Sequence, residues 1–555
     1  MIRRLSLAVS VAGIAPLAAG LLALAPTTAQ AGVAPPSPTC LPRSSAIPQD
    51  RAVLQHQQVV AGTGGRIIDV TLHSPALNGS THLDVMLPPG YDSSGRTHYP
   101  VLYLLHGASG SYRDWVSNGV EQLVDHTDAS LRLRPFITVM PDGGLFGFYT
   151  DWYGSDVDGH SPNPPPAWET YHMRELIPWI DSHYPTVADR SGRAIAGLSM
   201  GGFGAMTYAA KHPDLFAAAG SFSGAVDTDY NYPYANEILT DFSSAFTGGP
   251  PDHCIWGDAY TQDLHWRAAD ATYIAGNLRG VSLYLACGNG KAGPLDNPNS
   301  PALYAQESVE EFVWPMNLAL DAVLNADGIA HVDDFYGNGT HAWPYWLRDL
   351  THFLPQMNGA FKAVSLRTAP PSFDYWSAAN QFSVWGWRFA SHRAVPEFTY
   401  LSDVSRGGFE VSGSGLDSVV TAPLYRPGAP AKVTIGTTAG TVVADRLGKL
   451  AFDVNLGPAH TLQQTDFSGS ADASWAHVTV TIATPAMTTA ETMAATSGGG
   501  SQVAAASVLP NTAAGAGGDA AVRLLAVVAL LLGLGSVVAR ALRRTSTRLR
   551  RATWS

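Results

Sequence analysis

A serine between two glycines is the part of this sequence with the clearest chemical potential. Ser199 lies in Gly197-Leu198-Ser199-Met200-Gly201, after the apolar run 193–196 and before a helical stretch of small residues that ends near 211–213. A G-x-S-x-G sequence between a strand and a helix is typical of a nucleophile elbow, in which the serine takes a strained backbone conformation. Flanking glycines are needed because side chains there would collide with the neighbouring strand. The pattern predicts Ser199 as a nucleophile.

Such a serine needs a histidine as general base, and in hydrolases built around an elbow of this kind the order along the chain is serine, acid, histidine. The histidine is expected in a loop after the last strand of the sheet. His341, in the segment 337–343, lies in such a loop. Its position favours it as the base over four other histidines: His106, His253, His265 and His331.

The acid that orients the histidine is not fixed by spacing. Four carboxylates lie between the serine and the histidine: Asp296, Glu307, Glu310 and Glu311. The glutamates could also form the solvated face of a helix that buries Val309, Phe312, Val313 and Leu318. From the residues alone, these carboxylates remain alternatives.

An acyl-transfer site also needs two backbone amides that hold the oxyanion. One is expected from the residue after the nucleophile, Met200. The second is expected from the loop after a central strand, residues 106–110, where small residues allow close approach to the substrate, and we take Ala108 as the donor. His106 begins this loop, and a histidine in that position usually shapes the loop.

The elements that would position these residues run from about Val53 to Pro355, where strands alternate with helical stretches. Continuous apolar runs such as 101–105 suit a strand covered on both faces. The sequence therefore predicts an α/β sheet with helices on both faces and parallel connections. The expected strands are 66–73, 82–87, 100–105, 136–140, 193–196, 217–221, 281–286 and 331–335.

Beyond Pro355 the composition changes, and a linker ends at 369–371. Residues 373–487 contain short β-rich stretches broken by glycine, which predict an all-β, sandwich-like domain. From 488 to 518, alanine, glycine, serine and threonine dominate, as in a flexible stalk. The expected strands of the second domain are 398–404, 409–412, 418–425, 432–435, 449–455 and 477–482.

Both ends of the chain carry targeting features. Residues 1–31 have paired arginines, an apolar stretch and Ala29-Gln30-Ala31, the order of a secretory signal peptide. Residues 520–542 include the uncharged run Leu524–Ala539 and are followed by an arginine-rich tail to 555, which predicts a membrane or sorting-signal helix with a cytoplasmic tail. Upstream lies Leu509-Pro510-Asn511-Thr512-Ala513, which resembles a bacterial sortase signal except that Ala513 replaces the usual glycine. A simple membrane anchor is the alternative, and either would keep the protein on the cell surface.

The charge of the chain limits its possible binding partners, and its cysteine content limits the number of disulfides. The chain carries a net charge of −12, and about −20 without the signal and the segment after Thr512, which argues against a nucleic-acid partner. Three cysteines allow at most one disulfide, for which we expect Cys40 with Cys254. No cofactor and no metal are predicted, and we expect a monomer.

Six motifs together resemble a known family. In order, they are Leu104-Leu105-His106-Gly107, Thr150-Asp151-Trp152-Tyr153, Trp168-Glu169-Thr170, Gly197-Leu198-Ser199-Met200, Cys287-Gly288-Asn289-Gly290 and Asn338-Gly339-Thr340-His341-Ala342-Trp343. The set resembles the mycobacterial antigen 85 mycolyltransferases and the wider esterase D-like group of α/β-hydrolases. The resemblance covers most of the first domain and not the β domain or the tail.

The resemblance implies an α/β-hydrolase with Ser199 as nucleophile, His341 as base and Glu310 as acid. It also implies a free thiol at Cys287 near the helix of the acid. His106, Asp151, Trp152 and Trp343 are expected to line or shape the substrate cleft. The family has an aspartate that meets the sugar acceptor where this chain has His106, so trehalose does not carry over as acceptor. The local disulfide of the family is missing here as well.

These observations predict a secreted, surface-anchored serine acyltransferase or esterase. An acyl-enzyme would form from a carboxylic ester of a lipid or glycolipid, and the acyl group would pass to an envelope sugar or lipid hydroxyl, or to water. The sequence does not distinguish transfer from hydrolysis. The alternative function is a cell-surface adhesion or glycan-binding protein that uses the β domain, with the hydrolase fold as its carrier.

Overall fold

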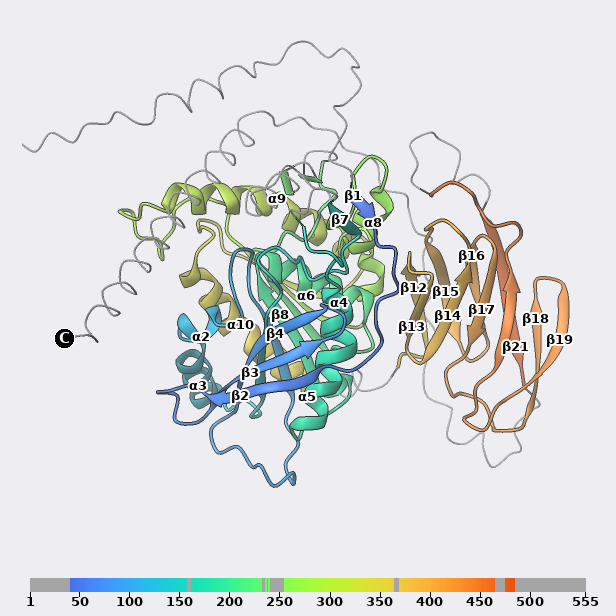
Figure 1. The fold of residues 1–555 in the computed structure, drawn as a ribbon, viewed down its shortest axis with the longest axis horizontal. Coiled ribbons are helices and arrows are strands. Elements are labelled where there is room, and N and C mark those ends of the chain that lie inside the picture. Colours follow the sequence, from blue (N-terminus) through green and yellow to red (C-terminus); the bar gives the residue numbers. More distant parts are fainter. Residues whose placement is uncertain are drawn as a thin grey trace, which may run out of the picture. The chain divides into compact units, whose positions relative to one another are not determined.

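The computed structural model describes residues 40–156, 161–231, 235–236, 238–239, 254–363, 369–464 and 475–484 (Figure 1). The predicted signal peptide, stalk, membrane helix and basic tail lie outside these residues. Among the helices in the described ranges, none combines the length and apolarity that crossing a membrane requires.

A nine-stranded mixed sheet forms the centre of the first domain, with the strand order β11-β10-β9-β8-β5-β6-β4-β3-β2. The strands from β11 to β6 are parallel to one another, whereas β4, β3 and β2 pair antiparallel. The parallel part places the carboxyl ends of its strands along one edge of the sheet. The strands are β2 (Val53–Val59), β3 (Ile67–Ser74), β4 (Gly79–Met86), β5 (Val101–Leu105), β6 (Ile137–Pro141), β8 (Arg193–Leu198), β9 (Ala218–Phe222), β10 (Ser282–Cys287) and β11 (His331–Phe335).

Both faces of this sheet are buried, as the apolar run in β5 predicts. Val101, Tyr103 and Leu105 belong to one hydrophobic cluster, and the alternate residues Leu102 and Leu104 belong to another. Successive side chains of a strand point to opposite faces, so the two clusters lie on opposite sides of the sheet. The first cluster also holds side chains of α6 and α9, and the second holds side chains of α10. The predicted α/β-hydrolase architecture is therefore present.

The helices that surround the sheet differ greatly in length. The longest, α9, follows β10 and carries the predicted acid, while α6 begins directly after Ser199 and α10 directly after Ala342. The helices are α2 (Asp114–Ser117), α3 (Val120–Leu131), α4 (Trp168–Thr170), η1 (Tyr171–Leu176), α5 (Ile177–His183), η2 (Arg190–Gly192), α6 (Met200–Lys211), α8 (Asp263–Ala269), η3 (Ala275–Leu278), α9 (Leu303–Ala326) and α10 (Trp343–Lys362).

The C-terminal part of the described chain forms two antiparallel sheets, one with the order β12-β15-β16-β21-β18-β19 and one with β13-β14-β17-β20. A single hydrophobic cluster takes side chains from both sheets, among them Phe389 and Val411, so the sheets pack as a sandwich. The strands are β12 (Ser372–Ser377), β13 (Gln381–Val384), β14 (Trp387–His392), β15 (Thr399–Ser405), β16 (Gly408–Gly413), β17 (Leu416–Val420), β18 (Pro430–Ile435), β19 (Thr438–Val443), β20 (Ala451–Asn455) and β21 (Ala476–Ala483).

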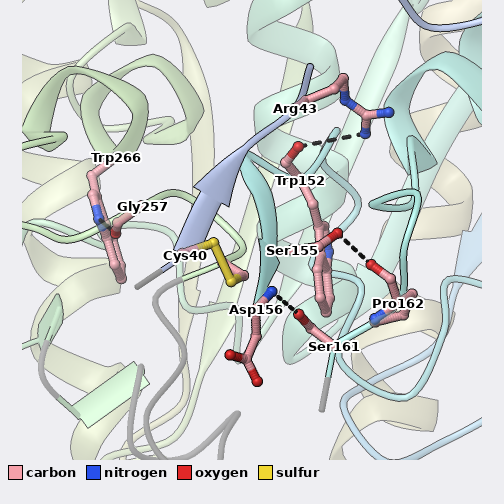
Figure 2. The surroundings of a disulfide bond; sticks show 10 residues. Cys40, Arg43, Trp152, Ser155, Asp156, Ser161, Pro162, Gly257 and Trp266 are labelled. Atoms are coloured by element: carbon pink, nitrogen blue, oxygen red, sulfur yellow. Dashed lines mark hydrogen bonds between the residues drawn. A yellow bond between two sulfur atoms is a disulfide. The ribbon is translucent and has the colours of Figure 1, made fainter. Parts of the chain in front are cut away.

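A short N-terminal strand, β1 (Cys40–Pro42), pairs antiparallel with β7 (Gly154–Asp156). It is joined to the rest of the domain by a disulfide between Cys40 and Cys254, with an S–S distance of 2.15 Å. Figure 2 shows this bridge beside β1 and the hydrogen bonds around it. The predicted cysteine pairing is confirmed, and Cys287 is a buried free thiol.

Candidate active site

Ser199 lies at the junction between β8 and α6, in the backbone conformation of a nucleophile elbow. Its φ is 53° and its ψ is −121°, and its amide donates to the carbonyl oxygen of Phe222 at 2.9 Å. A Cβ on Gly197 would lie 2.5 Å from the Gly201 backbone, and one on Gly201 would lie 2.6 Å from the Leu105 carbonyl oxygen. The two flanking glycines are therefore required by close backbone approaches, as the sequence motif indicates.

His341 and Glu310 form a hydrogen-bonded pair near the carboxyl edge of the parallel strands. Nδ1 of His341 lies 2.7 Å from Oε2 of Glu310, and the Glu310 side chain is fully buried. The imidazole packs edge-to-face on Trp346, with 5.0 Å between ring centroids. Its other nitrogen, Nε2, is buried and has no hydrogen-bond partner among the described residues. A histidine held this way can accept a proton at Nε2.

The second carboxylate oxygen of Glu310 is held by the ends of two neighbouring strands. Oε1 accepts hydrogen bonds from Ser223 Oγ at 2.7 Å, the Gly288 amide at 2.7 Å and Cys287 Sγ at 3.3 Å. These donors satisfy this oxygen and fix the rotamer of the side chain. Burial and the nearby charge of Glu310 raise the pKa of the Cys287 thiol well above its usual value. Cys287 is therefore a neutral thiol and a poor nucleophile.

The other candidate carboxylates have different partners. Asp296 accepts from Thr340 Oγ1 at 2.5 Å and from Tyr345 Oη at 2.9 Å, so it holds the loop that carries His341 without contacting the imidazole. Glu307 accepts from the amide of Ala292 at 3.2 Å. The side chain of Glu311 is exposed, on a different face of α9 from Glu310. Of the four alternatives, the geometry favours Glu310.

The rival histidines lie in other surroundings, except His253, which falls outside the described residues. His331 is the first residue of β11, at the opposite end of the strand from the His341 loop, and its Nε2 lies 2.8 Å from Asp321 Oδ1. Burial lowers the pKa of His265 to about 4, and its ring packs against Tyr153. Neither residue is placed to serve Ser199.

The loop after β5 lies close to Ser199. A Cβ on Gly107 would lie 2.6 Å from Leu198 Cδ1 and 3.3 Å from Ser199 Cβ, so only glycine permits this approach. Ala108 and Met200 both line the same pocket as Ser199. The amides of Ser109 and Gly110 donate to carbonyls within the fold, whereas the Ala108 amide has no acceptor in the described part of the chain. This arrangement suits an oxyanion hole built from Ala108 and Met200.

His106 does not face a cleft. Its side chain is 1% exposed, Nδ1 lies 2.8 Å from the Gly107 carbonyl oxygen, and Nε2 accepts from the Gly143 amide at 2.9 Å. Tyr149 Oη adds a hydrogen bond to the His106 carbonyl oxygen at 2.9 Å. The expectation that His106 binds substrate does not fit this placement, because both ring nitrogens are taken up by the backbone; His106 shapes the loop.

The other residues expected at the cleft are also absent from the pocket lining. Asp151 accepts from the amide and hydroxyl of Thr170 at 2.9 Å and 2.7 Å. Trp152 is buried and donates to the Gly147 carbonyl oxygen at 3.1 Å. Trp343 packs edge-to-face against Trp115 at 5.2 Å between centroids. Their contacts are those of residues that support the loops around the site.

An apolar pocket opens beside Ser199, with about 420 Å³ of space including its open mouth. The sequence did not single out most of its lining as substrate-binding. Three of its residues lie at i, i+3 and i+4 of α9 and flank Glu310, a helical spacing that could have suggested them. The lining is Ala108, Phe148, Ser199, Met200, Ala225, Ile238, Leu239, Val309, Phe312 and Val313. Apart from Ser199, every side chain in this set is apolar.

Comparisons with known proteins find similarity to esterases and to a mycolyltransferase. A family described as "Putative esterase" matches residues 74–357. The esterase Rv1288 of Mycobacterium tuberculosis is 42% identical over 173 residues, which cover 29% of this chain and 35% of that protein, so the match spans about a third of that relative. Ag85B of Mycobacterium avium, a diacylglycerol acyltransferase/mycolyltransferase, is 33% identical over 275 residues, which cover 49% of this chain and 78% of that protein. A solved ferulic acid esterase is 26% identical and covers 53% of this chain and 98% of its own, with a TM-score of 0.38.

Proposed function

The chain belongs to the esterase family that matches residues 74–357, and from this premise we propose that it is a serine-dependent esterase or acyltransferase. The single observation that carries the proposal is the Glu310–His341 pair, joined at 2.7 Å, at the same edge of the sheet as a serine in the elbow conformation. The family match supports ester chemistry, and the similarity to a mycolyltransferase supports acyl transfer as one form of it.

The first half of the proposed reaction forms an acyl-enzyme. His341 accepts the proton of Ser199 at Nε2 while Glu310 holds the Nδ1 proton and stabilises the imidazolium. The Ser199 oxygen attacks the ester carbonyl, and the amides of Ala108 and Met200 hold the oxyanion that develops. His341 then gives its proton to the leaving alcohol. Each oxyanion donor contributes about 3–4 kcal/mol to such a transition state.

The pocket beside Ser199 would bind the acyl group of the substrate. Its apolar lining offers no partner for charged or hydroxylated groups, so burial of a hydrocarbon is favoured by about 0.8 kcal/mol for each methylene. An ester whose acyl part is apolar therefore fits the site best.

The second half of the reaction releases the acyl group to an alcohol or to water. A sugar or lipid hydroxyl gives transfer, and water gives hydrolysis, with His341 as the base in both cases. The choice depends on how well the occupied site excludes water. We propose an envelope hydroxyl as the acceptor, on the strength of the similarity to the mycolyltransferase and of the signal and tail sequences.

We also propose that the protein acts outside the cytoplasm and is held at the cell surface. The disulfide between Cys40 and Cys254 supports this location, because such bridges persist in oxidising compartments. The signal-like sequence at residues 1–31 and the LPxT-like sequence before the apolar segment support it independently.

A fluorophosphonate probe tests the proposal. The wild-type protein is expected to be labelled and to hydrolyse p-nitrophenyl esters, while Ser199→Ala loses both properties. Ser182→Ala, a change at an exposed serine remote from the pocket, serves as the control and keeps both. A wild-type protein that folds but takes no label and cleaves no ester would refute the proposed chemistry. Adding sugar or lipid alcohols to the ester assay distinguishes acyl transfer from hydrolysis, because an alcohol that serves as acceptor takes the acyl group in place of water.

A further inference from the structure

Phe148 closes one side of the pocket beside Ser199. The Phe148 side chain is 2% exposed, and its ring packs edge-to-face against Phe203 at 5.8 Å and against Trp256 at 4.9 Å between centroids. Phe203 and Trp256 are themselves buried. Solid protein therefore lies behind Phe148, and an acyl chain cannot extend past this ring unless the ring moves.

The backbone around Phe148 is strained. Phe148 and Tyr149 are consecutive non-glycine residues with positive φ values of 45° and 46°. Such conformations persist only where the surroundings impose them, and they concentrate at functional sites. Here Tyr149 is anchored to the His106 carbonyl oxygen, and a Cβ on Gly147 would lie 2.1 Å from the Gly143 carbonyl oxygen. The loop thus holds the Phe148 ring in a fixed place against the pocket.

Trp256, which backs Phe148, lies two residues after the disulfide-bonded Cys254. The segment is pinned to β7, because Gly154 donates to the Cys254 carbonyl oxygen at 3.1 Å and Tyr153 donates to the Ile255 carbonyl oxygen at 2.8 Å. On its other side, Trp256 packs on Trp266 at 4.6 Å between centroids. Trp266 donates to the Gly257 carbonyl oxygen at 2.9 Å, and Figure 2 shows these two residues near the disulfide.

The N-terminal strand completes this support. In β1, Cys40 pairs with Asp156 and Pro42 with Gly154, so β7 lies between β1 and the segment that begins at Cys254. The Arg43 guanidinium donates to the Pro165 carbonyl oxygen at 2.8 Å. The disulfide therefore joins β1 to the segment that begins at Cys254, which are the two segments that flank β7. The second of these segments carries Trp256.

We propose that Phe148 determines which acyl groups the enzyme accepts, and that the Cys40–Cys254 bridge holds Trp256 behind it, so that reduction of the bridge relaxes acyl selectivity. This inference rests on the proposed function and deepens it: the preferred substrates are esters of compact acyl groups that end at the Phe148 ring. In the reduction, a thiolate of a dithiol such as dithiothreitol attacks one sulfur of the bridge, which releases one protein thiol and leaves a mixed disulfide. The second thiol of the reductant then attacks this mixed disulfide and releases the other protein thiol. Two protein thiols form, and the reductant becomes a cyclic disulfide.

The first experiment removes the ring. Phe148→Gly abolishes the side chain and also suits a positive φ, so the loop keeps its backbone without strain. We expect the ratio of kcat/KM for p-nitrophenyl octanoate to that for the acetate to rise by about tenfold over wild type, because space opens for further methylenes. Phe146→Ala is the matched control: Phe146 is buried in the same loop but does not line the pocket, and its ratio should stay at the wild-type value. An unchanged ratio in a folded Phe148→Gly protein would overturn the assignment, and Phe148→Leu repeats the test with a smaller change.

The second experiment opens the bridge. A Cys40→Ser, Cys254→Ser double variant is expected to shift the same ratio in the same direction, by about threefold, and dithiothreitol should shift the wild type equally. The reductant should cause no further shift in the double variant, which separates this effect from any reaction at Cys287. A lower Tm with an unchanged acyl profile would mean that the bridge only stabilises the fold, contrary to the proposal. A protein that takes the fluorophosphonate label but shows none of these shifts refutes this inference alone, whereas a protein that takes no label refutes the proposed function.

Discussion

Replacing Glu310 by glutamine tests the arrangement on which the mechanism depends. One oxygen of the carboxylate accepts hydrogen bonds from Ser223 Oγ, the Gly288 amide and Cys287 Sγ. The other oxygen is hydrogen-bonded to His341 Nδ1. A glutamine side chain must place its NH₂ group against one of these two sets of donors. Either the imidazole is driven into the wrong tautomer, or the buried amide and hydroxyl lose their acceptor. Loss of the charge-assisted bond alone costs about 1.5–3 kcal/mol.

The tautomer effect adds to this loss, so we expect kcat to fall by about 10³–10⁴, or ~4–5.5 kcal/mol in activation free energy. Steady-state hydrolysis of a p-nitrophenyl ester measures kcat, and circular dichroism checks the fold. Glu307→Gln is the control, because Glu307 lies one turn away on α9 and accepts from the Ala292 amide, not from the residues that hold Glu310. If Glu310→Gln stayed within about tenfold of wild type, or if Glu307→Gln fell as far, the assignment of the acid would be wrong.

Three further changes probe the oxyanion loop, a buried carboxyl and the histidine loop. Gly107→Ala should lower kcat by about 10–100-fold with little change in Tm, because its Cβ would lie 2.6 Å from Leu198 Cδ1 and would push the loop away from the oxyanion; an unchanged kcat would argue against the loop's role. Burial raises the pKa of Asp84 to about 7, so the folded state holds this proton more tightly than the unfolded chain does. The free energy of unfolding that this proton contributes is therefore full below about pH 4 and is lost as the pH rises through 7. From pH 5 to pH 8, urea unfolding should show the free energy of unfolding of the wild type falling by about 2–4 kcal/mol relative to that of Asp84→Asn. If the difference between the two proteins did not change with pH, the pKa of Asp84 would not be raised in the folded state. Thr340→Val removes the hydrogen bond to Asp296 and should reduce kcat by about three- to tenfold at constant KM; a change in KM alone would mean that the loop acts on binding.

The sheet was largely predictable because its strands have strong one-dimensional signals. The run 101–105 is apolar throughout and does lie between two cores, and each of the eight strands predicted from 66 to 335 is present with small shifts at its ends. In the first domain the strands β1, β2 and β7 escaped prediction, and in the second domain β12, β13, β14 and β19 did. All residues of β2 are exposed, so burial leaves no periodic mark on its sequence. The three residues of β7 form a strand only because β1 pairs with them.

The elbow at Ser199 could be predicted from sequence because local sterics dictate its backbone conformation and its glycines. Spacing alone left the acid open, because Glu307, Glu310 and Glu311 lie within about one turn of a helix and only the rotation of α9 against β10 decides which of them is buried. The family resemblance is what predicted Glu310. Likewise, His106 looked available for substrate because a sequence shows a histidine beside a catalytic loop but not the amide of Gly143, 37 residues away, that occupies its ring.

The rotation of α9 has a consequence beyond the identity of the acid. Glu310 points toward His341, while Val309, Phe312 and Val313 on the same helix line the pocket. The acid and one wall of the acyl pocket are thus parts of one rigid element, and a shift of α9 that enlarges the pocket also moves the carboxylate away from the imidazole. Phe148 belongs to the loop before Tyr149 and not to α9, so its side chain can be changed without moving the helix that carries Glu310. Acyl selectivity can therefore change at Phe148 without loss of the base, whereas enlarging the pocket from α9 is expected to reduce kcat for every ester.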